Sequence, residues 1–160
     1  MSRRVAVLLI PLIMALASCG SSSDNPTSGP SQYNRGKLCG EFAEFYKSVL
    51  AIDVEYPSQK DFDKPVSRAS ACIPSRSSGG TAGHLDMTRS LEDGTDEPND
   101  RAYEPQTGFN EKVWMAPGSR FRVQDGRWVG SMEFFNAELN NDQTRKAIEF
   151  LIRVTREVKG

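Results

Sequence analysis

The sequence predicts an α+β fold: a helix, an antiparallel sheet of about four or five strands, and a second helix, with the helices packed on one face of the sheet. Two stretches have the apolar spacing of amphipathic helices, and segments that alternate apolar and polar residues lie between them. Two cysteines are placed to join the first helix to the first strand. These three observations carry the fold prediction.

The first helix is predicted from Leu38 onward. Its apolar residues step by four, three and four positions, which is the spacing of one helix face. They are Leu38, Phe42, Phe45 and Val49, with Cys39, Tyr46 and Leu50 beside them. The helix must end before Pro57, and residues 53–65 are predicted to be a polar connection.

The first pair of strands is predicted over residues 69–75 and 82–91, joined by a glycine turn. With Gly79 and Gly80 at the centre of the turn, Cys72 faces Met87, Pro74 faces Leu85, and all four share one face of the sheet. Proline donates no ladder hydrogen bond, so the strand that contains Pro74 is expected at an edge of the sheet or near its own end.

The clearest hairpin signal joins residues 121–124 to 127–130 across Asp125-Gly126, because both residues of such a turn must tolerate positive φ. Pairing Gln124 with Arg127 places Val123 opposite Trp128. The predicted core face carries Phe121, Val123, Trp128, Gly130, Met132 and Phe134. The predicted solvent-exposed face carries Arg120, Arg122, Gln124, Arg127, Ser131 and Glu133. A preceding strand is expected over residues 113–116, ended by Pro117-Gly118.

The second helix closes the chain. Asn140, Asn141 and Asp142 are all residue types that cap helix N-termini. The apolar stripe that follows contains Ala147, Ile148, Leu151, Val154, Thr155 and Val158. Glu149 and Arg153 stand four residues apart, which predicts a supporting ion pair on the exposed side.

The chain opens with an export signal, in which Arg3 and Arg4 precede an apolar run over residues 5–17. That run is too short to span a bilayer, which needs about 20 apolar residues. The tetrapeptide Leu16-Ala17-Ser18-Cys19 resembles the lipobox of bacterial lipoproteins at all four positions. The resemblance implies that residues 1–18 are a signal peptide and that lipid on Cys19 anchors the protein at the extracytoplasmic face of the cell membrane.

An ordinary secretory signal with a cysteine near its cleavage site is the alternative interpretation of the N-terminus. The export route also stays open, because Ser2-Arg3-Arg4 partly matches a twin-arginine signal while the strongly apolar run favours general secretion.

Removal of residues 1–18 from the 160-residue chain leaves 142 residues, enough for one domain. The mature chain has 18 basic and 21 acidic residues, a net charge near −3, which is unlike the basic surface of a nucleic-acid-binding protein. Residues 19–36 are predicted to be the lipidated N-terminus and a disordered linker with almost no apolar side chains. Residues 37–160 are predicted to form a single disulfide-stapled α+β domain.

The two remaining cysteines, Cys39 and Cys72, are predicted to form a disulfide, because the export signal sends the chain to an oxidising compartment. A redox pair or a metal site is the alternative, but the chain has no Cys-x-x-Cys motif and a single histidine. With the lipobox, a cysteine on the first helix and one in the first strand, the plan resembles the small cell-envelope lipoproteins of actinobacteria. This resemblance implies location and fold, and it transfers no site residue.

Few side chains suit catalysis. His84 is predicted on the wet face of a strand beside Asp86 and Thr88, and Ser131 belongs to no Gly-x-Ser-x-Gly motif. The segment that contains Glu92, Asp93, Asp96, Glu97 and Asp100 is interpreted as a solvated loop, because its spacing departs from that of a calcium-binding loop. We predict no catalytic residue, no metal ligand and no cofactor.

The predicted binding surface consists of Arg120, Arg122 and Arg127, which suit anionic head groups, cell-wall polymers or an acidic partner. Tyr103, Phe109 and Trp114 either line a binding surface or pack beneath residues 93–111. The leading hypothesis is a non-catalytic binding or accessory module of the cell envelope, whose partner is an envelope protein, a cell-wall polymer or a small ligand, and not a nucleic acid. The alternatives are a secreted hydrolase that uses carboxylates, and a ligand-sensing lipoprotein that modulates a membrane kinase or transporter.

Overall fold

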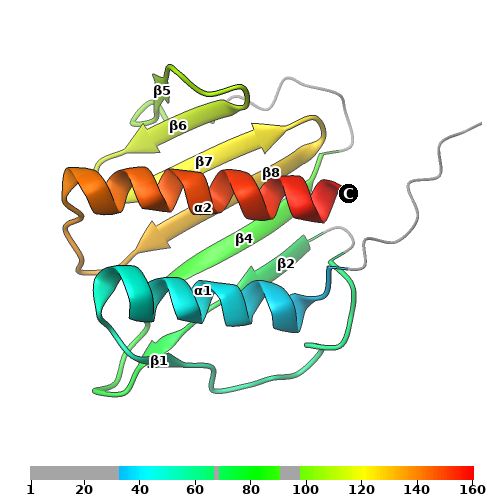
Figure 1. Ribbon diagram of the computed structural model, residues 1–160, viewed down its shortest axis with the longest axis vertical. Coiled ribbons are helices and arrows are strands. Elements are labelled where there is room, and N and C mark those ends of the chain that lie inside the picture. Colours follow the sequence, from blue (N-terminus) through cyan, green and yellow to red (C-terminus); the bar gives the residue numbers. More distant parts are fainter. Residues whose placement is uncertain (1–32, 67–68, 91–97) are drawn as a thin grey trace, which may run out of the picture.

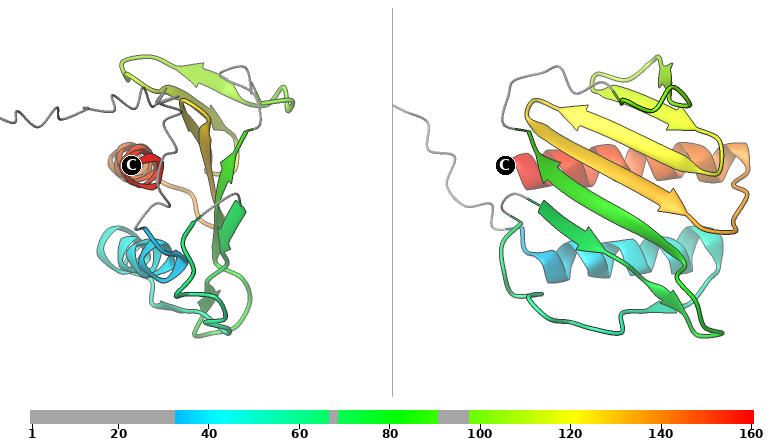
Figure 2. Two further views of the ribbon diagram at one scale, coloured as in Figure 1. Left: turned by 90° about the vertical axis from the view of Figure 1, so that its right-hand side faces the viewer. Right: turned by 180° about the vertical axis from the view of Figure 1, so that it is seen from behind.

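A computed structural model describes residues 33–66, 69–90 and 98–160. Two helices lie side by side on one face of an antiparallel sheet, so the fold is α+β with two layers (Figures 1 and 2). The predicted signal peptide, the lipobox with Cys19 and the linker before Tyr33 lie outside the described residues. The same holds for Glu92, Asp93, Asp96 and Glu97 of the acidic loop.

The elements alternate much as the sequence predicts, with additional short strands. In chain order they are α1 (Arg35–Leu50), β1 (Val54–Glu55), β2 (Ala69–Cys72), β3 (Ser75–Arg76), β4 (Gly83–Arg89), β5 (Glu104–Gln106), β6 (Lys112–Ala116), β7 (Arg120–Asp125), β8 (Trp128–Phe134) and α2 (Asn141–Lys159). Within the described residues the main sheet has six strands in the order β2-β4-β8-β7-β6-β5, and β1 pairs with β3 separately. Every pairing is antiparallel.

Asparagine side chains start both helices. The Asn34 side chain accepts a hydrogen bond from the Lys37 backbone N–H at 2.8 Å, so α1 begins three residues before the first predicted apolar position. The Asn140 side chain accepts from the Gln143 backbone N–H at 2.9 Å, and the Gln143 side chain accepts from the Asn140 N–H at 3.0 Å. This capping box satisfies two amide groups that the helix itself leaves without partners.

The core lies between the helices and the inner face of the sheet. The predicted stripes of both helices are buried there, except that Val49 and Leu50 at the end of α1 are half-buried. An aromatic cluster joins the two layers, with ring centroids 5.0 to 6.1 Å apart; it consists of Phe42, Phe45, Tyr46, Phe134 and Phe150. The predicted ion pair on α2 differs, since Arg153 contacts Glu41 and Glu157 and not Glu149.

The predicted pairing in the β7–β8 hairpin is wrong by two residues. Asp125 pairs with Trp128, so Val123 faces Gly130 and the two turn residues are Gly126 and Arg127. Gly126 takes the first turn position with φ of 60°, which suits glycine, while Asp125 turns its carboxylate to Lys159 of α2. A shift of two residues leaves every side chain on its predicted face, because the side-chain period of a strand is two.

The predicted pairing of the first two long strands is also wrong by two residues. Cys72 pairs with Leu85, and Ser70 pairs with Met87. The reason is that β2 ends at Cys72, and the chain then leaves the main sheet to pair Ser75–Arg76 with β1. The four residues predicted to share a face, Cys72, Pro74, Leu85 and Met87, are all buried.

Both edges of the sheet carry a feature that limits further strand pairing. At the β2 edge the Arg35 side chain donates from Nε to the carbonyl oxygen of Ala71 at 2.9 Å. At the other edge β5 contains Pro105, which has no amide hydrogen. The edge position that the sequence predicts for the strand before Pro74 is confirmed by the place of β2.

Cys39 of α1 and Cys72 of β2 form the predicted disulfide, with sulfur atoms 1.97 Å apart and both residues fully buried. The bond ties the helix layer to the edge strand of the sheet. We predict that replacing both cysteines by alanine lowers the free energy of unfolding by roughly 3 to 4 kcal/mol, because the unfolded chain loses a closed loop of about 34 residues. Denaturant unfolding of oxidised wild type and of the double variant measures the difference, and a value near zero would contradict the structural role.

Gly130 of β8 lets α2 approach the sheet closely. A β-carbon at this position would lie 2.5 Å from Thr155 Oγ1 and 2.9 Å from Leu151 Cδ1, both on α2. The Thr155 hydroxyl is held in place, since it donates to the Leu151 carbonyl oxygen at 2.7 Å. The core therefore has no room for a larger residue at position 130.

We predict that Gly130→Ala destabilises the protein by about 1 to 3 kcal/mol, because α2 must move away from the sheet. Gly40→Ala is the matched control: it lies on the exposed side of α1 with no atom within 4 Å of the added β-carbon, and alanine there should stabilise by about 0.5 to 1 kcal/mol. Thermal unfolding of both variants tests the comparison. Equal effects at the two positions would show that the close approach is unimportant.

Candidate binding site

The outer face of the sheet faces away from the helices (Figure 2, right). Strands that are distant in the sequence place polar residues on this face. His84 and Asp86 of β4 pair in register with Glu133 and Ser131 of β8. Ser131 pairs in turn with Arg122 of β7. We call these five residues the outer-face cluster. They come together because side chains alternate along each strand, so the odd or even residues of three adjacent strands share one face.

His84 lies between two carboxylates. Its Nε2 is 3.4 Å from an Asp86 carboxylate oxygen, and its Nδ1 is 3.9 Å from a Glu133 carboxylate oxygen. The His84 ring also packs edge-on against the Phe135 ring, with the ring centroids 5.7 Å apart. The predicted position of His84 on the polar face beside Asp86 and Thr88 is confirmed, but its side chain is only 31% exposed and so is less solvated than predicted.

Asp86 is a partly buried carboxylate. Burial raises its pKa above the ordinary aspartate value, and the nearby His84 works in the opposite direction. Among the described residues, the His84 ring nitrogen makes the only ion-pair contact with Asp86, and histidine carries a charge only when it is protonated. A carboxylate that gives up water without a close cationic partner is costly to keep, so its position is a candidate for a functional role.

A hollow of about 390 Å³ opens beside Asp86 on the outer face. It is bordered by Ala69, Ser70 and Ala71 of β2, Asp86 and Thr88 of β4, Ser131 of β8 and Arg122 of β7. The edge strand contributes only small side chains, which leaves space next to the larger side chains of the inner strands. The volume is in the range of small-molecule sites, which begins at about 300 Å³.

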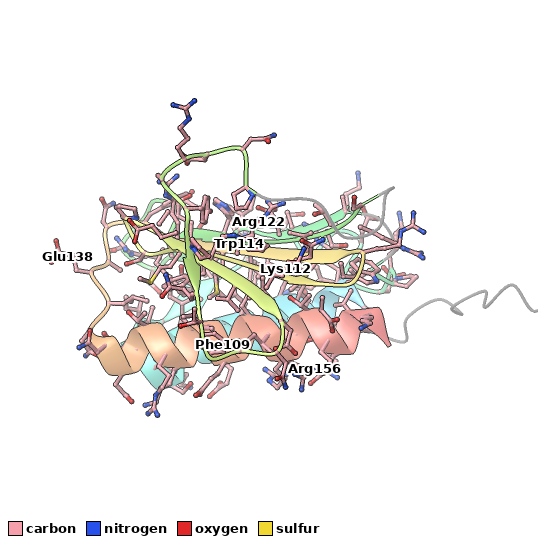
Figure 3. The ribbon with its side chains drawn as sticks, turned by 90° about the horizontal axis from the view of Figure 1, so that it is seen from above. Phe109, Lys112, Trp114, Arg122, Glu138 and Arg156 are labelled. Carbon is pink, nitrogen blue, oxygen red and sulfur yellow. A yellow bond between two sulfur atoms is a disulfide. The ribbon has the colours of Figure 1, made fainter. Side chains whose placement is uncertain are left out.

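The three arginines of the predicted binding surface occupy different places. Arg122 borders the hollow, and Figure 3 shows it with Lys112 and Trp114 on the side of the sheet away from the helices. Arg120, at the start of β7, binds the Asp100 carboxylate at 3.0 Å and lies over the Tyr103 ring. Arg127 is in the turn at the opposite end of β7, a strand about 17 Å long. The structure therefore places Arg122 at the site and separates Arg120 from Arg127.

Some residues of the outer face are buried. The prediction that Gln124 is exposed to solvent is therefore wrong. Its side chain is only 3% exposed and donates to the Gly126 carbonyl oxygen at 3.1 Å. Val129 and Trp114 are also buried. Of the three aromatic residues considered for a binding surface, Trp114 is thus excluded, while Phe109 packs against the core and Tyr103 contacts Arg120.

The hydrolase alternative gains no support from the described residues. His84 faces carboxylates and pairs in register with Glu133, whereas Ser131 pairs with Asp86. Of the acidic residues in the predicted loop, Asp100 forms an ion pair with Arg120, and the others, such as Asp96, lie outside the described residues. In the described part of the chain no three metal-binding side chains gather at one point.

Neither helix of the described structure has the length and apolar character needed to cross a membrane. No family model, no curated protein and no solved structure matches the chain.

The pKa of Asp86 makes stability depend on pH. Because the folded-state pKa lies above the unfolded value, the folded protein holds the proton more tightly, and the free energy of unfolding falls as pH rises through that interval. We predict that Asp86→Asn removes this loss and stabilises the protein at pH 8 relative to wild type. The gain should stay below about 1 kcal/mol, because 39% of the side chain is exposed.

Thermal unfolding at about pH 8 and about pH 4 measures this effect, since aspartate has an ordinary pKa near 3.9. The advantage of Asp86→Asn should shrink at the lower pH. Asp53→Asn, which removes a carboxylate at an exposed position after α1, is the control. Destabilisation by Asp86→Asn at the higher pH would mean that the carboxylate is a net structural contributor.

Proposed function

We propose that this protein is a lipid-anchored module at the extracytoplasmic face of the cell membrane, with a non-catalytic binding or accessory role in the cell envelope. The anchor is the diacylglycerol on Cys19 that the lipobox implies. The binding surface is the outer face of the sheet around the hollow. The partner classes are an envelope protein, a cell-wall polymer or a small ligand.

The binding role is supported by a difference between the two faces of the sheet. The inner face is closed by α1 and α2 and holds the core, while the outer face holds the hollow and the outer-face cluster. A partly buried carboxylate and hydroxyl groups around a hollow add little to folding, but they supply the directional contacts that a ligand needs. The disulfide agrees with the oxidising location that the export signal implies.

The position of Tyr33 supports the anchoring arrangement. This residue is buried and is the first described residue of the domain, fourteen positions after Cys19. An anchor on Cys19 would therefore join the domain at the start of α1. The end of α2 lies at the same end of the domain, where Lys37 contacts Glu157 at 3.3 Å.

We predict that the mature protein begins at Cys19 and carries an acyl mass, because the lipobox directs both modification and cleavage. Mass spectrometry of the membrane fraction from the native host measures both. Cys19→Ala should abolish the acyl mass and release the protein from the membrane, while Ser21→Ala should change neither. A mature protein that begins elsewhere without an acyl mass would overturn the anchor.

The same preparation tests the binding surface. Purified in mild detergent, the wild-type protein should retain a partner or ligand that a variant with both Asp86→Asn and Ser131→Ala loses. Equal recovery with the two proteins would remove the outer face from the proposal.

A further inference from the structure

We propose that the outer-face hollow binds the protonated primary amine of a small ligand, with Asp86 as the counter-ion and Ser131 as a neighbouring hydrogen-bond acceptor. This inference rests on the proposed binding function and names the chemistry that the site would recognise. The shared chemistry is an alkylammonium group, which both simple amines and free amino acids carry.

Asp86 receives few hydrogen bonds from the protein itself. A carboxylate accepts about four hydrogen bonds, and the described contacts of Asp86 supply the His84 ring nitrogen at 3.4 Å. Within the described residues no lysine or arginine lies at ion-pair distance from this carboxylate. An ammonium group would bring three donors and a positive charge, which the described protein contacts of Asp86 do not supply.

The lining of the hollow combines apolar and hydroxyl groups. Ala69 and Ala71 offer methyl groups on one side, and Ser131 offers a hydroxyl directly across from Asp86. A small amine with a short carbon chain matches this combination of one charged, one hydroxyl and one apolar contact. Glu133, which lies beside His84, adds a second negative charge to the same region and would repel an anionic ligand.

The described lining also argues against other ligand classes. It contains no aromatic ring, so the hollow lacks the flat apolar surface on which a sugar ring would stack. No group of three metal ligands exists among the described residues, which disfavours a divalent cation. The single arginine, Arg122, stands two strands away from Asp86 and lies across the hollow from it.

A contact with Arg122 would distinguish an amino acid from a simple amine as the ligand. Adjacent strands are about 4.8 Å apart, so roughly 10 Å separates the backbones that carry Asp86 and Arg122. Both side chains border the hollow. An amino acid would place its ammonium at Asp86 and its carboxylate toward Arg122. A simple amine would use Asp86 and Ser131 only.

Two-dimensional NMR titrations of the mature protein in detergent test the inference, with ethylamine, glycine and acetate as probes near neutral pH. Ethylamine or glycine should give saturable shifts at the amides of Ala71, Asp86 and Ser131, and acetate should give none. Binding of glycine about tenfold tighter than that of ethylamine would identify an amino-acid site. Comparable affinities, or tighter binding of ethylamine, would identify an amine site without a carboxylate contact.

The matched variants are Asp86→Asn, which keeps the shape of the side chain, and Asp53→Asn, which removes an exposed carboxylate elsewhere. Asp86→Asn should weaken the binding of the effective probe by at least about tenfold, and Asp53→Asn should leave it unchanged. No saturable shift with either amine, or equal binding by the Asp86→Asn variant, would overturn the inference. If the amines do not bind but Cys19 is acylated, the proposed anchored module is retained and only the amine site is rejected. If Cys19 is not acylated but the amines bind, the amine site is retained and only the anchor is rejected.

Discussion

The bond between Cys39 and Cys72 is the interaction on which the arrangement of the two layers depends. The strand β2 has four residues and a single neighbour in the main sheet, so backbone pairing alone holds it weakly. The disulfide fixes it to α1, and α1 is held in turn by the aromatic cluster against β8 and α2. Because β2 forms one wall of the hollow, a bond buried on the inner face determines the shape of the outer face.

The two helices and the faces of the strands could be predicted from the sequence, because both depend on local periodicity. The spacing of Phe42 and Phe45 indicates the buried side of α1, and the alternation along residues 120–134 indicates the inner and outer sides of β7 and β8. Register was harder to predict, because Asp125-Gly126 and Gly126-Arg127 are both compatible with a two-residue turn. The choice is made by the φ of Gly126 and the pairing of Asp125 with Lys159, and the latter involves a residue far along the chain.

The outer-face cluster could be predicted only in part. His84 and Asp86 share a strand, so their common face follows from the alternation of a single segment. Glu133 and Ser131 join them through the pairing of β4 with β8, and these strands are separated by three others in the sequence. No local pattern fixes that pairing, and the hollow depends on it. The short strands β1, β3 and β5 were missed because two or three residues, one of them Pro105, give no periodic signal.

The Arg35 side chain protects the β2 edge from pairing with strands of other molecules. Under the proposed anchoring, copies of the protein would diffuse in two dimensions and meet often, and an open strand edge would allow them to pair and aggregate. The guanidinium occupies the Ala71 carbonyl that an incoming strand would need, and Pro105 offers nothing to donate at the opposite edge. Both features disfavour β-sheet pairing between the strand edges of neighbouring molecules. Contacts with other molecules are then left to the broad faces of the domain.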